Sequence, residues 1–212
     1  MNEPSGEERG LDLDRVVFFS DAVFAIAMTV LVLSIHVPSV SHGQIGRALR
    51  DQLPAIYSYF LSFAVIALYW LVHHRMFHWI QRIDGTAITI NLVLLSFVAI
   101  LPFPTDLLGR YGDTPVGTMT YAAAIAAVGA TSSTLWWYVS HTPGLLRPDT
   151  PPRYVRHGQL RALAATAVFA LSIPVALWSV VAAQCMWLLL IPARMVLSRR
   201  FGSLYAAPNV TR

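Results

Sequence analysis

Lysine is absent from the 212-residue sequence, cysteine occurs once, and charged residues make up only 12% of the chain. Soluble domains usually carry about 25% charged residues, so this composition excludes an ordinary water-soluble fold. The lone Cys185 excludes a disulfide within the chain. Hydrophobic residues make up 56%, which predicts an all-α integral membrane protein with the lipid bilayer as its solvent. The net charge of +4 is therefore assigned to loops at the membrane surface, and we expect no nucleic-acid partner.

Six hydrophobic segments approach the length of about 20 residues that a helix needs to cross a bilayer. The predicted spans are 15–37, 53–80, 86–101, 116–139, a short fifth helix from 160 to about 172, and 174–197. The third span ends near Pro102 and Pro104, and two prolines so close together predict an irregular or reentrant end. Pro174 is expected to separate the fifth helix from the sixth. Residues 140–158 are expected to form the longest interior loop.

Arginine placement predicts the orientation of the chain. With six spans and both termini on one side, twelve arginines lie on that side, and only Arg47, Arg50 and Arg110 lie on the other. Cytoplasmic loops carry the excess of positive charge, so both termini are expected to be cytoplasmic. The chain then divides into a cytoplasmic tail (1–14), a membrane domain (15–198) and a second cytoplasmic tail (199–212).

The first predicted span has an apolar stripe. With about 100° of rotation per residue, Ile26, Val30, Leu33 and Val37 fall within about 60° of one another. Phe19 lies on the same side, nearer the start of the helix. Stripes of this kind are ordinary where a membrane helix packs or contacts lipid. In a symmetric oligomer whose copies of this helix meet at an axis, the stripe would instead form a hydrophobic constriction.

A second face of the same span carries polar groups. Ser20 and Asp21 lie about 120° and 140° from Ile26 around the helix axis. A carboxylate at membrane depth costs about 2.5 to 3.5 kcal/mol on insertion scales, so Asp21 is expected to have a partner inside the protein. Arg15 fits either the same polar network or an interfacial arginine that reaches the lipid headgroups.

Three stretches together carry a resemblance to a known family. The first is an Arg-x-x-x-Phe-Ser-Asp motif at residues 15–21, and the second covers residues 69–77 with the sequence Tyr-Trp-Leu-Val-His-His-Arg-Met-Phe. The third joins Asn91 to a Leu-Pro-Phe-Pro-Thr sequence at residues 101–105. In this order on six predicted helices, they resemble the bacterial relatives of the lysosomal potassium channel called transmembrane protein 175.

The resemblance implies a potassium-favouring cation channel in a bacterial plasma membrane. No Thr-Val-Gly-Tyr-Gly filter sequence occurs in the chain. In the family, the first helices surround the pore, and this chain carries one six-helix unit, which implies a homotetramer. Ile26 matches the constriction position, with Val30 and Leu33 as further apolar pore positions. The other expected pore-lining residues are Phe19, Thr29 and Val37. Potassium ions would only pass through, and neither a cofactor nor enzyme activity is expected.

We predict that the second and third spans brace the polar face of the first. Trp70 and His74 share one face of the second span, and His73 lies about 100° away from His74. The motif residues are Arg15, Phe19, Ser20 and Asp21, and their expected partners are Trp70, His73 or His74, and Asn91. The alternative is that the histidines are ordinary polar anchors near the cytoplasmic interface.

Three other functions compete with the channel. A proton-coupled transporter would use Asp21 with His73 and His74 as a relay, but the chain shows no clear inverted repeat or paired broken helices. A membrane enzyme could use a metal at His73, His74 and His78. However, only two of these histidines share a helical face, and a zinc site needs three or four ligands. The third alternative is a non-conducting assembly protein.

Overall fold

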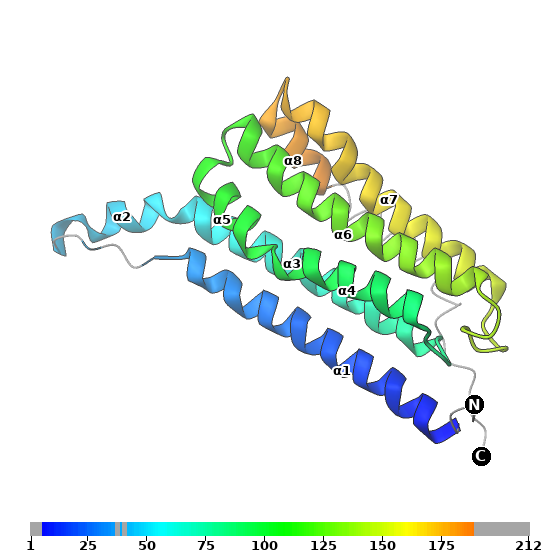
Figure 1. The fold of residues 1–212 in the computed structure, drawn as a ribbon. Helices are drawn as coiled ribbons and strands as arrows, with labels where there is room; N and C mark the ends of the chain where they lie inside the picture. Colours follow the sequence, from blue (N-terminus) through cyan, green and yellow to red (C-terminus); the bar gives the residue numbers. More distant parts are fainter. Residues whose placement is uncertain (1–5, 37–38, 40–41, 189–212) are drawn as a thin grey trace, which may run out of the picture.

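A computed structural model describes residues 6–36, 39 and 42–188 and shows an elongated bundle of helices (Figure 1). The helices in chain order are α1 (Gly6–Val30), η1 (Leu31–Ser34), η2 (His42–Gln44), α2 (Ile45–Asp51), α3 (Leu53–His78), α4 (Gly85–Ala99), α5 (Pro102–Tyr111), α6 (Pro115–His141), α7 (Pro152–Ala176) and α8 (Val180–Leu188). Within the described part of the chain, the only β pairing is an isolated bridge between Ile80 and Leu146. The all-α prediction is therefore confirmed.

The helices form successive layers across the bundle. In Figure 1, α1 lies along one edge, α3 and α4 lie beside it, α6 follows, and α7 with α8 lies along the opposite edge. α1 packs against α3 and α4, whereas α6 packs against α4, α5 and α7. Tyr121, Ile125, Val128 and Leu135 of α6 are completely buried. The core of the chain therefore centres on α6, and α1 is a peripheral helix with one free side.

Four helical stretches within the described residues are long and apolar enough to cross a membrane. They are Asp12–Ser34, Leu53–His78, Gly85–Tyr111 and Pro152–Ala176. α6 has 27 residues and is also long enough by length alone, but it contains many alanine, serine and threonine residues. Small side chains of this kind let neighbouring membrane helices approach closely. The predicted sixth span extends beyond Leu188, outside the described residues.

The first span and the linker that follows it differ from the predicted bounds. α1 begins at Gly6 instead of residue 15 and continues through η1 to Ser34. Val37, predicted to line the pore, lies outside the described residues. The linker before the second span contains the short helix α2, which the hydrophobicity pattern did not reveal.

The two prolines at the end of the third span begin a new helix. α4 ends at Ala99, and α5 starts at Pro102 after a break at Ile100 and Leu101. Proline is tolerated in the first turn of a helix, because the N–H groups of that turn have no intrahelical acceptor. The predicted break is present, but the helix beyond it was missed.

The prediction that Pro174 separates the last two helices is wrong. α7 starts at Pro152, inside the predicted loop, and runs through Pro174 to Ala176. Pro174 lies in the last turn, where its ring disturbs only the end of the helix. The chain reverses after it, with the N–H groups of Leu177 and Trp178 bonded to the carbonyls of Pro174 and Val175.

Gly129 provides a test of the contact between α6 and α7. A Cβ atom at this position would overlap Thr166 Oγ1 and would lie 2.8 Å from Tyr69 Oη. Gly129→Ala should therefore lower the stability of the folded protein by about 1 to 3 kcal/mol through overpacking. Thermal unfolding in detergent measures the effect, with Gly46→Ala as the control, because nothing lies within 4 Å of a Cβ there. Equal melting temperatures for the two variants would contradict this close packing.

Candidate functional site

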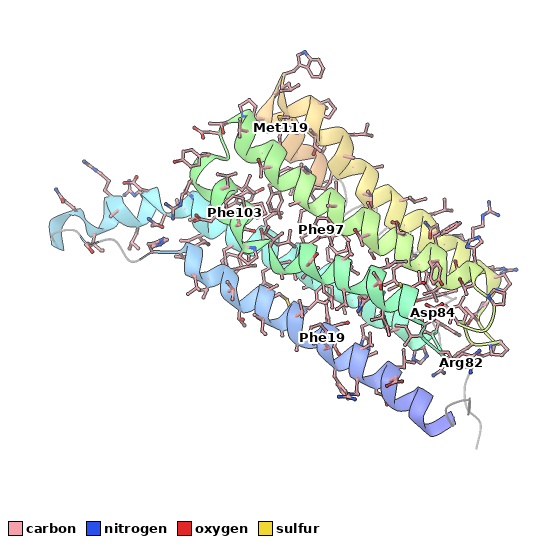
Figure 2. All side chains as sticks on the ribbon, viewed as in Figure 1. Phe19, Arg82, Asp84, Phe97, Phe103 and Met119 are labelled. Atoms are coloured by element: carbon pink, nitrogen blue, oxygen red, sulfur yellow. The ribbon has the colours of Figure 1, made fainter. Side chains whose placement is uncertain are left out.

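α1 buries one face and exposes the opposite one. Ser20, Phe24 and Leu31 are at most 1% exposed, on the side where α3 and α4 pack. Ile26 and Leu33 of the predicted stripe are 61% and 70% exposed. Figure 2 shows that the drawn side chains of α1 on the side away from the bundle meet no other described part of the chain. The apolar stripe therefore has no packing partner among the described residues.

The remaining predicted pore residues lie on the same free side where they are described. Val30 is 36% exposed, Phe19 is 54% exposed, and Thr29 is exposed. The Thr29 hydroxyl donates to the Ile26 carbonyl at 2.9 Å, as is common for threonine within a helix. Phe18 is also exposed at 72%, so the free surface is wider than the stripe.

A chain of hydrogen bonds joins the packed side of α1 to α4 and α3. The Asn91 side-chain amide donates to Ser20 Oγ at 3.0 Å, and Ser20 Oγ donates to the Val16 carbonyl at 2.7 Å. Asn91 Oδ1 lies 3.0 Å from His73 Nε2. Because Ser20 uses its single proton on Val16, it must accept from Asn91. The Asn91 oxygen then faces His73, which must donate from a protonated Nε2.

Asp21 has a separate partner on α3. Trp70 Nε1 donates to Asp21 Oδ1 at 2.8 Å, and both side chains are half-buried. A tryptophan N–H can only donate, so it suits a carboxylate oxygen at this depth. The His74 ring lies 5.6 Å from the Trp70 ring and is exposed. Of the two histidines considered, the structure brings His73 into the hydrogen-bonded network and leaves His74 outside it.

Two aromatic rings hold His73 in place. The His73 ring stacks on Phe77 with 4.3 Å between centroids, and the Phe24 ring of α1 lies 5.4 Å away. His73 is 1% exposed. The sequence interpretation did not include Phe24 in the network, although it lies on the same face of α1 as Ser20, one turn further along. We use the name bracing network for Ser20, Asp21, Phe24, Trp70, His73, Phe77 and Asn91.

Arg15 does not join the bracing network. Its side chain is exposed, and no bond links it to the network within the described residues. Arg15 precedes Ser20 by five residues, and about 500° of rotation places the two side chains roughly 140° apart. Membership of the same sequence motif therefore does not put Arg15 on the packed face. Its direction is close to that of the apolar stripe.

A second buried polar cluster, which the sequence interpretation missed, lies at the other end of the bundle. Thr105 Oγ1 lies 2.8 Å from Ser62 Oγ, and Ser62 Oγ donates to the Tyr121 hydroxyl at 3.2 Å. All three side chains are at most 1% exposed, and they tie α3, α5 and α6 together. Thr105 belongs to the Leu-Pro-Phe-Pro-Thr stretch at residues 101–105, but nothing in the sequence linked it to Ser62 and Tyr121.

The histidines do not assemble into a metal centre in the described part of the chain. No group of three histidine, cysteine, aspartate or glutamate side chains there could hold a metal ion. His73 already donates to Asn91, and His78 stacks edge-on against Trp79.

Comparison with known sequences places these residues in a family. The profile described as endosomal/lysosomal potassium channel TMEM175 matches residues 15–102. A potassium channel of Streptomyces collinus is 35% identical over 152 residues, which are 69% of this chain and 74% of that protein. A potassium channel of Chamaesiphon minutus is 36% identical over 152 residues, covering 69% of this chain and 73% of that protein.

Comparison with solved structures extends the similarity to most of the chain. The crystal structure of a Chamaesiphon minutus homologue of the lysosomal potassium-selective channel TMEM175 matches with a TM-score of 0.74 and 27% identity. The match covers 92% of this chain and 99% of that chain. The shared fold therefore includes α6 and α7, which lie beyond the matched sequence profile.

Asn91→Ala tests whether the bracing network fixes α1. The change leaves the buried Ser20 and His73 side chains without their partner, which should cost about 1 to 3 kcal/mol. The expected result is a lower melting temperature, together with faster hydrogen exchange in the half of α1 that contains Ser20. Thr89→Ala on the same helix is the control, because the exposed Thr89 hydroxyl bonds only the Gly85 carbonyl. If both variants behave like the parent protein, the network does not hold α1.

Proposed function

This chain belongs to the TMEM175 family and is a potassium channel, and from that premise we propose that α1 from each of several copies lines its pore. It is an ion channel and not an enzyme. In the proposed channel, Ile26, Val30 and Leu33 form a hydrophobic constriction that takes the place of a carbonyl filter. Such a constriction can close by dewetting and restricts which ions pass.

One observation carries the proposal, namely that the two faces of α1 differ in the single chain. Ser20 and Asp21 bond to Asn91 of α4 and Trp70 of α3. On the other face, Ile26 and Leu33 remain 61% and 70% exposed. A helix placed between its own bundle and a pore axis must have these two faces. Lipid contact alone would also leave the stripe exposed, and substitution at Ile26 distinguishes the two situations.

We further propose a homotetramer of six-span chains with cytoplasmic termini. The direction of the described helices supports this orientation, because α3 ends and α7 starts at the same end of the bundle (Figure 1). Arg75, Arg82, Arg153 and Arg156 belong to that end, whereas the opposite end has Arg47, Arg50 and Arg110. Excess arginine marks the cytoplasmic side. The number of four copies comes from the family resemblance, in which a chain with one six-helix unit implies a tetramer.

The bracing network has a mechanical role in this proposal. Ser20 and Asp21 point away from the stripe, so they cannot contact an ion at the constriction. Their bonds to Asn91 and Trp70 set the rotation of α1 about its own axis. This rotation decides which side chains of α1 face the pore, so loss of the network should affect assembly or opening of the channel. Because Ser20 and Asp21 do not contact the ion, the preference for potassium over sodium should stay unchanged.

Ile26→Ser tests the constriction. A hydroxyl in place of a branched aliphatic removes the barrier to wetting, so potassium flux into liposomes should rise several-fold, and the preference for potassium over sodium should fall. Flux measured separately with each ion, on protein reconstituted at equal density, gives both quantities. The comparison starts from the parent protein. Its liposomes should show a flux that protein-free liposomes lack, and this flux should be larger for potassium than for sodium.

Val32→Ser is the matched control for Ile26→Ser. Val32 is also exposed, at 50%, but four α-helical steps and two 3₁₀ steps from Ile26 place it roughly 80° away from Ile26. Its replacement should leave flux and ion preference unchanged. Equal behaviour of the two serine variants would show that the stripe is a lipid-facing surface and would remove Ile26 from the pore.

Asp21→Ala tests the mechanical role of the network. Loss of the acceptor for Trp70 should lower the fraction of assembled oligomer, measured by light scattering in detergent, or lower the potassium flux several-fold. The ratio of potassium to sodium permeability should stay the same. Asp21→Asn keeps an oxygen that can accept from Trp70 and should retain most of the assembly. A changed permeability ratio in a fully assembled Asp21→Ala channel would contradict this assignment.

A further inference from the structure

A cavity of about 550 Å³ lies where α6 ends and α7 begins, away from α1 and its network. Its walls come from the end of α6, the connecting residues 142–151 and the first turns of α7. The basic side chains His141, Arg147 and Arg156 line the cavity together with Leu146 and Leu160, and no aspartate or glutamate is among the lining residues. The cavity therefore combines positive charge with an apolar wall.

The structure holds the connecting segment in a defined shape. The backbone N–H groups of Gln81 and Arg82 donate to the Leu145 carbonyl, and the Arg147 N–H donates to the Trp79 carbonyl. Figure 2 places Arg82 and Asp84 at this same end of the bundle. The Arg147 and Arg156 side chains are nevertheless exposed. The cavity is thus built on a fixed backbone, and its two guanidinium groups remain available to a ligand.

The position of the cavity matches the depth of lipid headgroups. α7 is long and apolar enough to cross a membrane, and the cavity surrounds its first turns. Trp137, which is 53% exposed, and Tyr154 with Trp79 lie at the same end. Tryptophan and tyrosine concentrate at the membrane–water interface. Leu160 of the cavity wall and Leu163 beyond it are exposed along α7, where an acyl chain would run.

We propose that this cavity binds the headgroup of an anionic phospholipid. Arg147 and Arg156 would hold the phosphate through charge-assisted hydrogen bonds, and guanidinium groups suit phosphate oxygens because they donate in pairs. His141 donates from Nδ1 to the Trp137 carbonyl at 2.8 Å, so a neutral His141 ring offers only an acceptor at Nε2, and the phosphate contacts are assigned to the two arginines. The apolar wall formed by Leu146 and Leu160 accepts the start of an acyl chain. Basic pockets between membrane helices on the cytoplasmic side commonly recognise anionic lipids.

Lipid binding to the purified protein tests the proposal without any measurement of ion flux. Native mass spectrometry of the detergent-solubilised protein, titrated with phosphatidylglycerol or with phosphatidylcholine of the same acyl chains, gives the affinity for each lipid. Phosphatidylglycerol should bind more tightly to the parent protein. The double variant Arg147→Gln with Arg156→Gln should weaken its binding by about tenfold, since each arginine near a membrane surface favours an anionic lipid.

The matched control is the double variant Arg82→Gln with Arg153→Gln. It removes the same charge from the same end of the bundle, and neither residue lines the cavity. Retention of phosphatidylglycerol by the control, together with its loss in Arg147→Gln with Arg156→Gln at an unchanged melting temperature, supports the site. Equal losses in both double variants, or equal binding of the two lipids, would overturn it. Displacement of phosphatidylglycerol by inorganic phosphate at an equal concentration would also overturn it. The cavity would then bind phosphate alone, and the acyl chain would contribute nothing to the affinity.

Discussion

The one-sided packing of α1 is the constraint on which the rest of the structure depends. α1 contacts α3 and α4 along a single face. Hydrogen bonds are directional, so the bonds from Asn91 to Ser20 and from Trp70 to Asp21 fix the rotation of α1 about its own axis. A rotation of about 100°, the step of one residue, would take Ser20 away from Asn91 and leave buried polar groups unpaired. The direction of the apolar stripe is therefore set by polar groups on the opposite face.

The residues that contact the packed face of α1 lie on helices that are themselves buried in the bundle. His73 is packed between Phe24 and Phe77, and Asn91 shares its helix with the fully buried Ala87 and Val98. Asp84 caps α4 by accepting from the Ala87 N–H at 2.8 Å, and its second oxygen accepts from Tyr138 of α6 at 2.7 Å. The position of Asn91 is thus tied to the central helix α6. The bracing network joins a peripheral helix to the buried part of the bundle.

Much of the network could be predicted from the sequence, because polar residues within apolar helices must find partners. Within the predicted set, Ser20 bonds to Asn91 and Asp21 bonds to Trp70. The choice between His73 and His74 could not be made, since adjacent residues differ by about 100° and the buried face of α3 was unknown. The motif left Arg15 between this network and an interfacial position, although its angle of about 140° from Ser20 disagrees with a place in the network. Pro174 was predicted to be a helix boundary, because proline usually ends a helix. The sequence does not show that the helix continues for two residues beyond it. The cavity beside Arg147 depends on how residues 142–151 dock on residues 79–82, which no periodicity reveals.

The membrane changes what holds the proposed channel together. In water, the exposed stripe would drive association by itself, but lipid tails are as apolar as leucine, so burial of the stripe against other copies yields little hydrophobic free energy. Association in the bilayer must come from close packing and polar contacts between copies. Close packing requires that each α1 presents the same side chains at the same angle. The bracing network supplies this angle within each chain before the copies meet, and this is why two side chains that never face the proposed pore, Ser20 and Asp21, decide what does face it.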